Sequence, residues 1–226
     1  MYANKYNLVN QLKEEAFTSL IDQKLAAVLM KSNKMVTKPC RNLAKNLCQG
    51  VKTSSIHAEV NAIMSYFGKS FYYDKINNKV FFDEKKSAKL NLFVIRINKT
   101  GDMCNARPCY NCLNIMQLVG IKKIYYSISN EEIICENIKD MISIQCSAIS
   151  RYLDNKINTP NNIEYYEKLI EKIFPEKIKF SNLEKFIKYN LMNVLPKAKI
   201  EILKNKDDLG VNIIHNNKIL KTALIY

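Results

Sequence analysis

Tryptophan is missing from this chain, histidine is scarce, and no long apolar run occurs in the sequence. Two histidines are found among 226 residues, and no apolar stretch approaches the roughly 18 residues that a membrane span needs. The N-terminal segment, MYANKYNLVNQLKEEAF, lacks the basic start and the apolar middle of a signal peptide. We therefore expect a soluble intracellular protein that is neither secreted nor held in a membrane.

The spacing typical of a disulfide framework is also absent. Seven cysteines, an odd number, are scattered along the chain, which fits a reducing compartment better than a disulfide scaffold. The sequence has no internal repeat and no Gly/Ser-rich linker, and apolar residues make up 47% of it. That content can fill the core of one large domain, or of a domain with an extension packed against it.

Acidic residues are too few to balance the basic ones, and the imbalance is local. The net charge is +14, and residues 1–130 hold 20 Lys/Arg against 8 Asp/Glu, the remainder 15 against 13. The stretch between Asp22 and Glu59 has no acid and contains Lys31, Lys34, Lys38, Arg41, Lys45 and Lys52. Such a concentration can attract phosphate, although AT-rich coding DNA also gives a Lys-rich composition. Few arginines and no tryptophan argue against a nucleic-acid track, because strand binders add stacking platforms to charge.

Strands and helices alternate through the first part of the chain. Apolar spacing and turn residues predict a helix at 8–21, a hairpin at 25–39, a helix at 58–67, a strand at 91–97, a helix at 109–119 and a strand at 122–129. Ser54 or Ser55 is suited to cap the second helix, and Gly120 to close the third. This alternation predicts an α/β domain across residues 1–130, a sheet with helices packed on its faces.

Two further segments depart from this alternation. Residues 69–89 contain no His or Cys, and we interpret them as an insertion. This insertion is expected to form either a small aromatic hairpin or part of a surface that binds a partner. Residues 131–226 are expected to form a smaller α+β extension with two helices near 162–174 and 181–193. Three strands follow in it, joined by Asp-Leu-Gly and Asn-Asn turns.

Two short motifs, HAE at 57–59 and PCYNC at 108–112, indicate a metal site. Cys109 and Cys112 are three residues apart at a predicted helix start, so both sulfurs lie on one face. A helix N-terminus also stabilises thiolates, and Pro108 suits the first turn. His57 and Glu59 point in different directions from a helix start. One of them can therefore hold the metal while the other faces what the metal activates.

The number of ligands predicts what kind of site this is. One histidine and two thiolates leave the fourth tetrahedral position of Zn²⁺ open, which is the catalytic pattern, whereas structural sites have four protein ligands. Zinc lowers the pKa of bound water to about 7, and a carboxylate such as Glu59 can carry protons from that water to a leaving group. The predicted chemistry is hydrolytic. The alternative is a closed structural site with a fourth ligand from Cys104, Cys40 or Cys48.

In these motifs the chain resembles the zinc-dependent cytidine and deoxycytidylate deaminase superfamily, whose signature is H-x-E followed by P-C-x-x-C. The resemblance covers about residues 20–130. It implies a three-layer α/β/α fold, Zn²⁺ held by His57, Cys109 and Cys112, and Glu59 as the catalytic proton shuttle. Two substrate contacts are hypotheses: Asn42, where family members often place a sugar-binding asparagine, and Arg107 for a phosphate. The long gap between the motifs and Arg107 itself depart from the family pattern and leave the pocket shape undefined.

The function implied is hydrolytic deamination of the cytosine of a free nucleoside or nucleotide to uracil, with release of ammonia. The alternatives are a polynucleotide deaminase acting on cytosine or adenine, and a non-catalytic zinc-bearing protein that binds nucleic acid or is structural. The motif does not separate these, because water attacks an amidine carbon in every deaminase of the group. A small-molecule substrate is favoured over nucleic acid, and a homo-oligomer is left open. His215 is expected to be a strand residue rather than a ligand.

Overall fold

The computed structural model describes residues 2–44, 47–48, 51–52, 55–74, 77, 79–87, 89–145, 163–192, 195–204 and 209–226. The chain divides into two compact units, Met1–Lys139 (unit 1) and Asp140–Tyr226 (unit 2). Unit 1 thus runs past residue 130, because a strand at Ile133–Asn137, which sequence analysis had not identified, belongs to its sheet. None of the helices in the described part of the chain combines the length and apolar character needed to cross a membrane.

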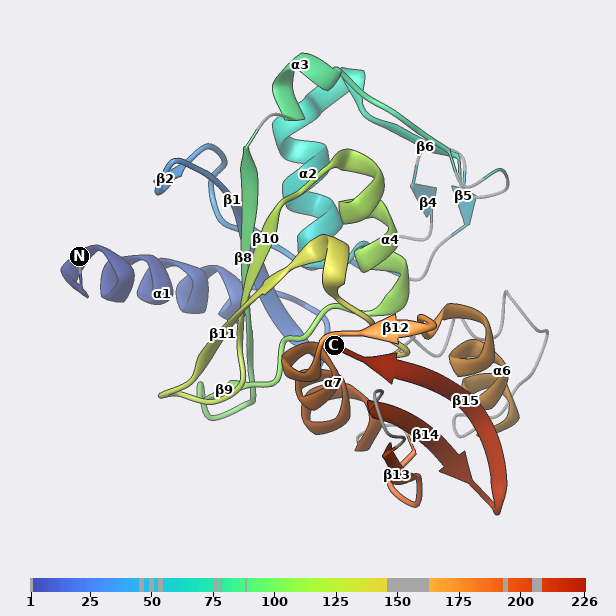
Figure 1. Ribbon diagram of the computed structural model, residues 1–226. Coiled ribbons are helices and arrows are strands. Elements are labelled where there is room, and N and C mark those ends of the chain that lie inside the picture. Colours follow the sequence, from blue (N-terminus) through green and yellow to red (C-terminus); the bar gives the residue numbers. More distant parts are fainter. Residues whose placement is uncertain are drawn as a thin grey trace. The chain divides into compact units, whose positions relative to one another are not determined.

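A seven-stranded mixed sheet forms the centre of unit 1 (Figure 1). Its main path runs β11-β10-β8-β1-β2, with β3 paired to β1 and β9 to β8. Only the β8 and β10 pair is parallel among the described pairings of this sheet. The strands are β1 (Lys24–Lys31), β2 (Lys34–Met35), β3 (Cys40–Arg41), β8 (Leu90–Ile97), β9 (Met103–Cys104), β10 (Lys123–Ser127) and β11 (Ile133–Asn137).

Helices cover both faces of this sheet, so unit 1 has the predicted three-layer α/β/α architecture (Figure 1). Helix α1 (Tyr2–Phe17) buries Leu8, Leu12 and Ala16 against one face. That face presents Ala26, Val28, Phe93, Ile95 and Ile97 from the two central strands. The alternate residues of the same strands, such as Ala27 and Leu92, are buried on the other face. There α2 (Ala58–Phe67) and α4 (Tyr110–Val119) pack, each ending at a glycine.

The local boundaries follow from a few residues. Ser32 and Asn33 both take positive φ between β1 and β2, the backbone of a two-residue hairpin turn. Gly120 takes the left-handed conformation at the end of α4, as predicted. Helix α1 ends at Phe17 and not at residue 21, as had been predicted. The apolar spacing on which the prediction was based continues into the turn that follows the helix.

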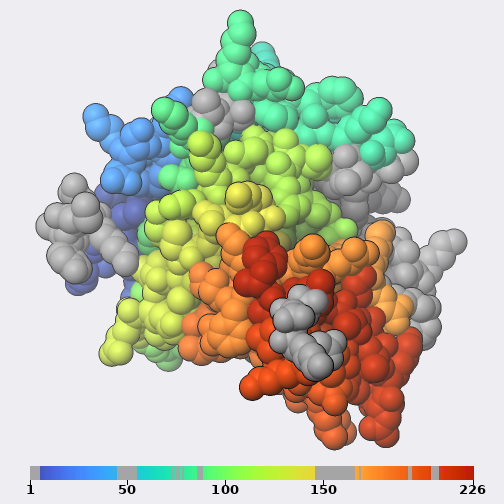
Figure 2. Space-filling model, viewed as in Figure 1, coloured from blue at the N-terminus to red at the C-terminus, as the bar shows by residue number. Residues whose placement is uncertain are grey.

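The segment 69–89 forms a small aromatic hairpin. Strands β6 (Tyr72–Asp74) and β7 (Lys79–Phe81) pair antiparallel, and a short helix α3 (Glu84–Ser87) follows. Phe67 packs against Phe71 and Phe82 at its base. Tyr72 and Phe81 form an exposed cross-strand pair, and the segment lies on the visible surface of unit 1 (Figure 2). A second short hairpin pairs β4 (Leu47–Cys48) with β5 (Val51–Lys52).

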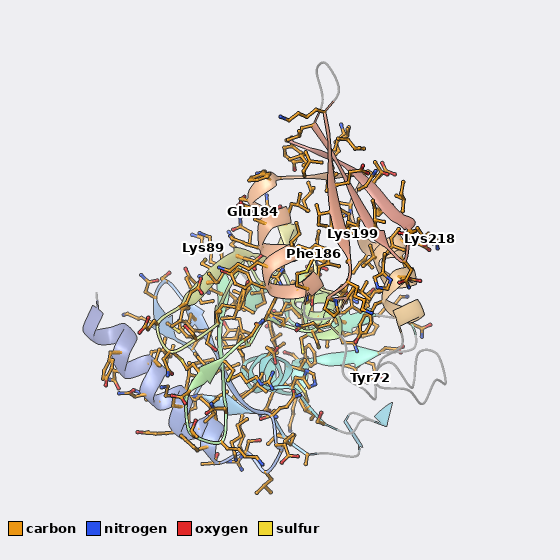
Figure 3. The ribbon with its side chains drawn as sticks, turned by 90° about the horizontal axis from the view of Figure 1, so that it is seen from below. Tyr72, Lys89, Glu184, Phe186, Lys199 and Lys218 are labelled. Atoms are coloured by element: carbon orange, nitrogen blue, oxygen red, sulfur yellow. The ribbon has the colours of Figure 1, made fainter. Side chains whose placement is uncertain are left out.

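Unit 2 is the smaller α+β part that the sequence predicted. Its sheet runs β12-β15-β14-β13, and Phe186 of α7 is fully buried and packs on Phe174 (Figure 3). The elements are α6 (Ile163–Ile173), β12 (Lys177–Ile178), α7 (Phe180–Phe186) continued by a π-helix (Ile187–Leu191), β13 (Lys199–Lys204), β14 (Leu209–His215) and β15 (Lys218–Ile225). The Asn216–Asn217 turn is confirmed by two positive φ values. Leu209 and Gly210, however, belong to β14 rather than to an Asp-Leu-Gly turn.

Buried polar residues of unit 2 are paired within that unit. Asn190 Oδ1 accepts the backbone N–H of Ile144 at 2.8 Å, and His215 Nδ1 lies 2.8 Å from Glu167 Oε1. His215 lies in β14, as expected from the sequence, and its contact with Glu167 was not predicted.

Candidate metal centre

The two motifs lie at the first turns of α2 and α4. His57 is the N-cap of α2 with φ −68° and ψ 153°, and Cys109 is the N-cap of α4 with φ −72° and ψ 164°. An N-cap residue has extended backbone, so its side chain leaves the helix in a different direction from those of the first turn. The predicted cap Ser55 therefore lies two residues before the N-cap of α2, and Ser54 lies outside the described residues. In α4, Pro108 precedes the N-cap and is not part of the first turn.

Hydrogen bonds hold the residues around His57 in place. The neighbouring Ile56 pairs with Leu43 through two backbone bonds, N to O, of 2.8 and 2.9 Å. The His57 carbonyl accepts the N–H of Asn61, whose Nδ2 donates to the Arg41 carbonyl at 2.8 Å. At the other helix, the Cys109 carbonyl accepts the N–H of Leu113 at 3.0 Å. The start of α2 is therefore fixed to the backbone around it, whereas the bond given for Cys109 lies within the first turn of α4.

His57, Cys109 and Cys112 are brought together as the sequence predicted. Their ligand atoms all lie within 4.8 Å of one another. The Nδ1 atom of His57 is 3.5 Å from Cys109 Sγ and 3.3 Å from Cys112 Sγ. One imidazole nitrogen and two sulfurs at this spacing can share one ion, and the mixed N/S set suits zinc.

The three ligands also polarise one another. A hydrogen bond from Cys112 and the nearby His57 hold the pKa of Cys109 well below its usual range. The same thiol pair and burial raise the pKa of Cys112. The negative charge of Cys109 raises the pKa of His57 to about 9. The neighbouring protein groups therefore already favour the thiolate form of Cys109. A divalent cation would also favour the thiolate form of Cys112, because thiolates are the form that binds metal.

Glu59 is buried beside these ligands with an unsatisfied oxygen. The side chain is 2% exposed, and its Oε2 atom has no hydrogen-bond partner within the described structure. Burial raises the pKa of Glu59, while the His57 charge opposes that shift. A buried carboxyl oxygen without a partner costs free energy unless a ligand or water satisfies it. Its position next to the candidate metal ligands leaves this oxygen available to a molecule bound at the centre.

A fourth protein ligand is not found among the described side chains. The Sγ atom of Cys40 donates to the Lys38 carbonyl, and that of Cys104 donates to the Asp102 carbonyl. Neither belongs to the cluster formed by the three ligands. The Cys48 side chain lies outside the described residues.

The structure uses Asn42 to join strands. Its side chain is buried, its Oδ1 accepts the N–H of Leu25 at 3.1 Å, and its Nδ2 donates to the Gln23 carbonyl at 2.6 Å. The hydroxyl of Ser19 donates to the Asn42 carbonyl. The oxygen and the nitrogen of the side-chain amide are thus both hydrogen-bonded to backbone groups at the start of β1. This arrangement favours a structural role for Asn42 over the sugar contact that we had hypothesised.

Arg107 lies in the interior of unit 1. Its side chain is 1% exposed and forms an ion pair with Glu136 of β11. The same guanidinium nitrogen donates to the Tyr126 hydroxyl of β10 at 2.7 Å, and that hydroxyl donates to the Glu136 carboxylate. Because the charge of Arg107 is matched inside the protein, this placement does not favour the phosphate contact that we had hypothesised. Sequence analysis gave no role to Glu136, whose strand it had not identified.

The basic stretch is only partly available to a ligand. Lys34 and Lys38 are exposed, whereas Arg41 Nη1 donates to the Thr18 hydroxyl and lies 3.6 Å from Glu15. Lys45 lies outside the described residues, and for Lys52 only the backbone is described. Among the described side chains of this stretch, Lys34 and Lys38 are thus exposed cations that can meet an anionic group.

No protein-family model and no curated protein matches this chain. Among solved structures, a dCMP deaminase from the cyanophage S-TIM5, in complex with dCMP and dUMP, is similar over 55% of this chain and 77% of its own. The sequence identity is 18% and the TM-score is 0.31. The function proposed below rests on the geometry of the metal centre itself.

Proposed function

We propose that this protein is a zinc-dependent hydrolytic deaminase that converts the cytosine of a nucleoside or nucleotide to uracil and releases ammonia. The observation that carries the proposal is the juxtaposition of three N/S ligand atoms with the buried, unsatisfied Oε2 of Glu59. The order H-x-E then P-C-x-x-C, each at a helix start, adds the deaminase signature to this geometry.

His57, Cys109 and Cys112 would hold the zinc ion. When bound, zinc supplies Lewis acidity that makes water a nucleophile near neutral pH. The three side chains would supply one ligand fewer than a structural zinc site has, and no fourth ligand is found among the described residues, which fits a catalytic site. The two helix starts would hold these ligands beside Glu59.

Glu59 would carry the protons. Its burial raises its pKa towards the range where it can both accept and release a proton near neutrality. It would take one proton from the attacking water as the C4–O bond forms and give that proton to the ring nitrogen. It would then take the second proton from the new C4 hydroxyl and give it to the amino group as the C4–N bond breaks. Water adds and ammonia leaves, so atoms and charge balance with no further reactant.

The experiment begins with the metal. The purified chain should hold one zinc, and Cys112→Ser should lose it, because a hydroxyl is a poor replacement for a thiolate. Cys104→Ser is the matched control and should keep the ion, since Cys104 lies outside the ligand cluster. Loss of zinc from Cys104→Ser would indicate a closed site and remove the catalytic interpretation.

Turnover is then measured as ammonia release across nucleosides, monophosphates and single-stranded oligonucleotides. Glu59→Gln should keep zinc and lower the rate on the preferred substrate by about 10² to 10⁴-fold, the contribution of a general acid–base group. Unchanged activity in this variant would take Glu59 out of the mechanism. Release from oligonucleotides alone would favour a polynucleotide substrate, and zinc binding without ammonia release would favour a non-catalytic protein.

A further inference from the structure

A network of three buried side chains, Arg107, Tyr126 and Glu136, lies close in sequence to the candidate metal centre. Arg107 is separated from the ligand Cys109 by Pro108 alone. Its guanidinium, the Tyr126 hydroxyl and the Glu136 carboxylate are bonded to one another in the interior. The Arg107 guanidinium carbon also lies 5.6 Å from the centre of the Tyr126 ring, within cation–π range.

The same segment is fastened to β10 by backbone bonds. The Ala106 N–H donates to the Ser127 carbonyl at 2.8 Å, and the Ser127 hydroxyl donates to the Cys104 carbonyl at 2.7 Å. The Arg107 N–H donates to the side chain of Asn105 at 2.9 Å. Residues 104–107 are therefore attached to β10 by their backbone and to β10 and β11 by one side chain. Proline at 108 then restricts φ before the ligand.

Stability alone is a weak explanation for this arrangement. A buried ion pair loses so much hydration that apolar replacement of the pair is often neutral or stabilising. The ion pair does fix the orientation of the Arg107 side chain, because a planar guanidinium binds its partners in a fixed geometry. This orientation is set two residues before Cys109, so it restrains the backbone that leads to the Cys109 side chain.

We propose that Arg107, Tyr126 and Glu136 are positioning residues for the metal centre, holding Cys109 at the distance from His57 and Cys112 that one zinc ion requires. This role rests on the proposed zinc site. It assigns to Arg107 a function in orienting a metal ligand, in place of contact with a substrate phosphate. Side chains that orient metal ligands typically change metal affinity by about 10 to 100-fold when replaced.

The test is a variant that removes the polar network without leaving a buried charge. Arg107→Met, Tyr126→Phe and Glu136→Leu combined replace every member by an apolar side chain of similar size. Zinc affinity is measured at equilibrium by competition with a chromophoric chelator, beside unfolding in urea of the metal-free chain. We expect a zinc affinity at least about 10-fold weaker, with unfolding unchanged or shifted to higher urea. A folded triple variant with the wild-type zinc affinity would overturn the proposal.

A milder pair of variants guards against failure to fold. Tyr126→Phe removes one hydroxyl of the network, and Tyr125→Phe removes the hydroxyl of its neighbour, which stacks on Phe93 at the opposite sheet face. The first should weaken zinc binding and the second should not. Equal affinities in the two variants would count against the positioning role.

Amide hydrogen exchange of residues 103–113, measured on the metal-free chain, separates this proposal from the proposed function. The network variants should exchange faster there than the wild type, whether or not zinc binds. If the wild-type chain takes up no zinc, the proposed function fails. Unchanged exchange in the triple variant would show that the network does not hold the segment, and the positioning role would fail on its own.

Discussion

Asn42 illustrates, at the scale of one residue, how a buried amide can replace missing sheet bonds. Its side chain joins the Leu25 N–H to the Gln23 carbonyl, two backbone groups at the edge of β1 that would otherwise need other partners. Asn42→Ala removes both bonds, which join Asn42 to the half-buried Leu25 and to the exposed Gln23. We expect a loss of about 1 to 3 kcal/mol in the free energy of unfolding.

Urea unfolding measures this loss, and Asn7→Ala on the exposed surface of α1 is the control. Asn7 accepts one hydrogen bond from Gln11, so its replacement should change the free energy of unfolding by less than about 0.5 kcal/mol. Equal effects of the two variants would show that the Asn42 bonds contribute nothing specific.

The sequence predicted which side chains form the candidate metal centre more sharply than it predicted substrate contacts, and the reason is chemical. Few residue types ligate zinc, so a histidine and a Cys-x-x-Cys pair already restrict the choice to His57, Cys109 and Cys112. An asparagine or arginine can instead face a ligand, solvent or the interior, and one-dimensional patterns do not separate these cases. Asn42 and Arg107 were both hypotheses for substrate contacts, and their burial and internal hydrogen bonds favour structural roles instead.

At the scale of elements, the metal centre depends on where two helices begin and end. Gly120 ends α4 in the left-handed region with φ 79°, and its N–H donates to the carbonyls of Gln117 and Met116. A Cβ atom at this position would meet nothing within 4 Å, so the cost of substitution is purely conformational. We expect Gly120→Ala to lower the free energy of unfolding by about 1 to 2 kcal/mol.

Gly120→Asn provides the matched comparison, because asparagine tolerates the left-handed region better than alanine. It should be less destabilising than Gly120→Ala in the same urea titration. A larger effect of asparagine would mean that side-chain bulk, rather than backbone strain, determines the cost at this position.

Elements with a clear apolar pattern or turn signal were predicted well, and an element without one was missed. The hairpin of β1 and β2, β8, α4 and β10 all lie where apolar spacing and turn residues indicated. Strand β11 was missed, although Ile133–Asn137 is as long as β10, because its one buried side chain is that of a glutamate. That glutamate is the partner of Arg107, so missing one strand also hid the network beside the metal centre.

At the scale of the whole molecule, the described metal ligands all belong to unit 1. Unit 2 has its own buried residues, including Phe186, Ile213 and Val211. A ligand that binds only the folded state stabilises it in proportion to RT ln(1 + [L]/Kd), about 2.7 kcal/mol at 100 times Kd. Zinc should therefore stabilise the unit that holds its ligands.

Removal of zinc tests this expectation by amide hydrogen exchange of the full chain with and without a chelator. We expect faster exchange at residues 57–62 and 109–114, the first turns of α2 and α4, because zinc joins these two helix starts. Residues 209–225 of β14 and β15 should exchange at the same rate in both samples, since they contribute no ligand to the described cluster. Cys112→Ser is the control, in which the chelator should have no effect. Equal changes in both units would show that zinc acts on the molecule as a whole and not through the site at His57, Cys109 and Cys112.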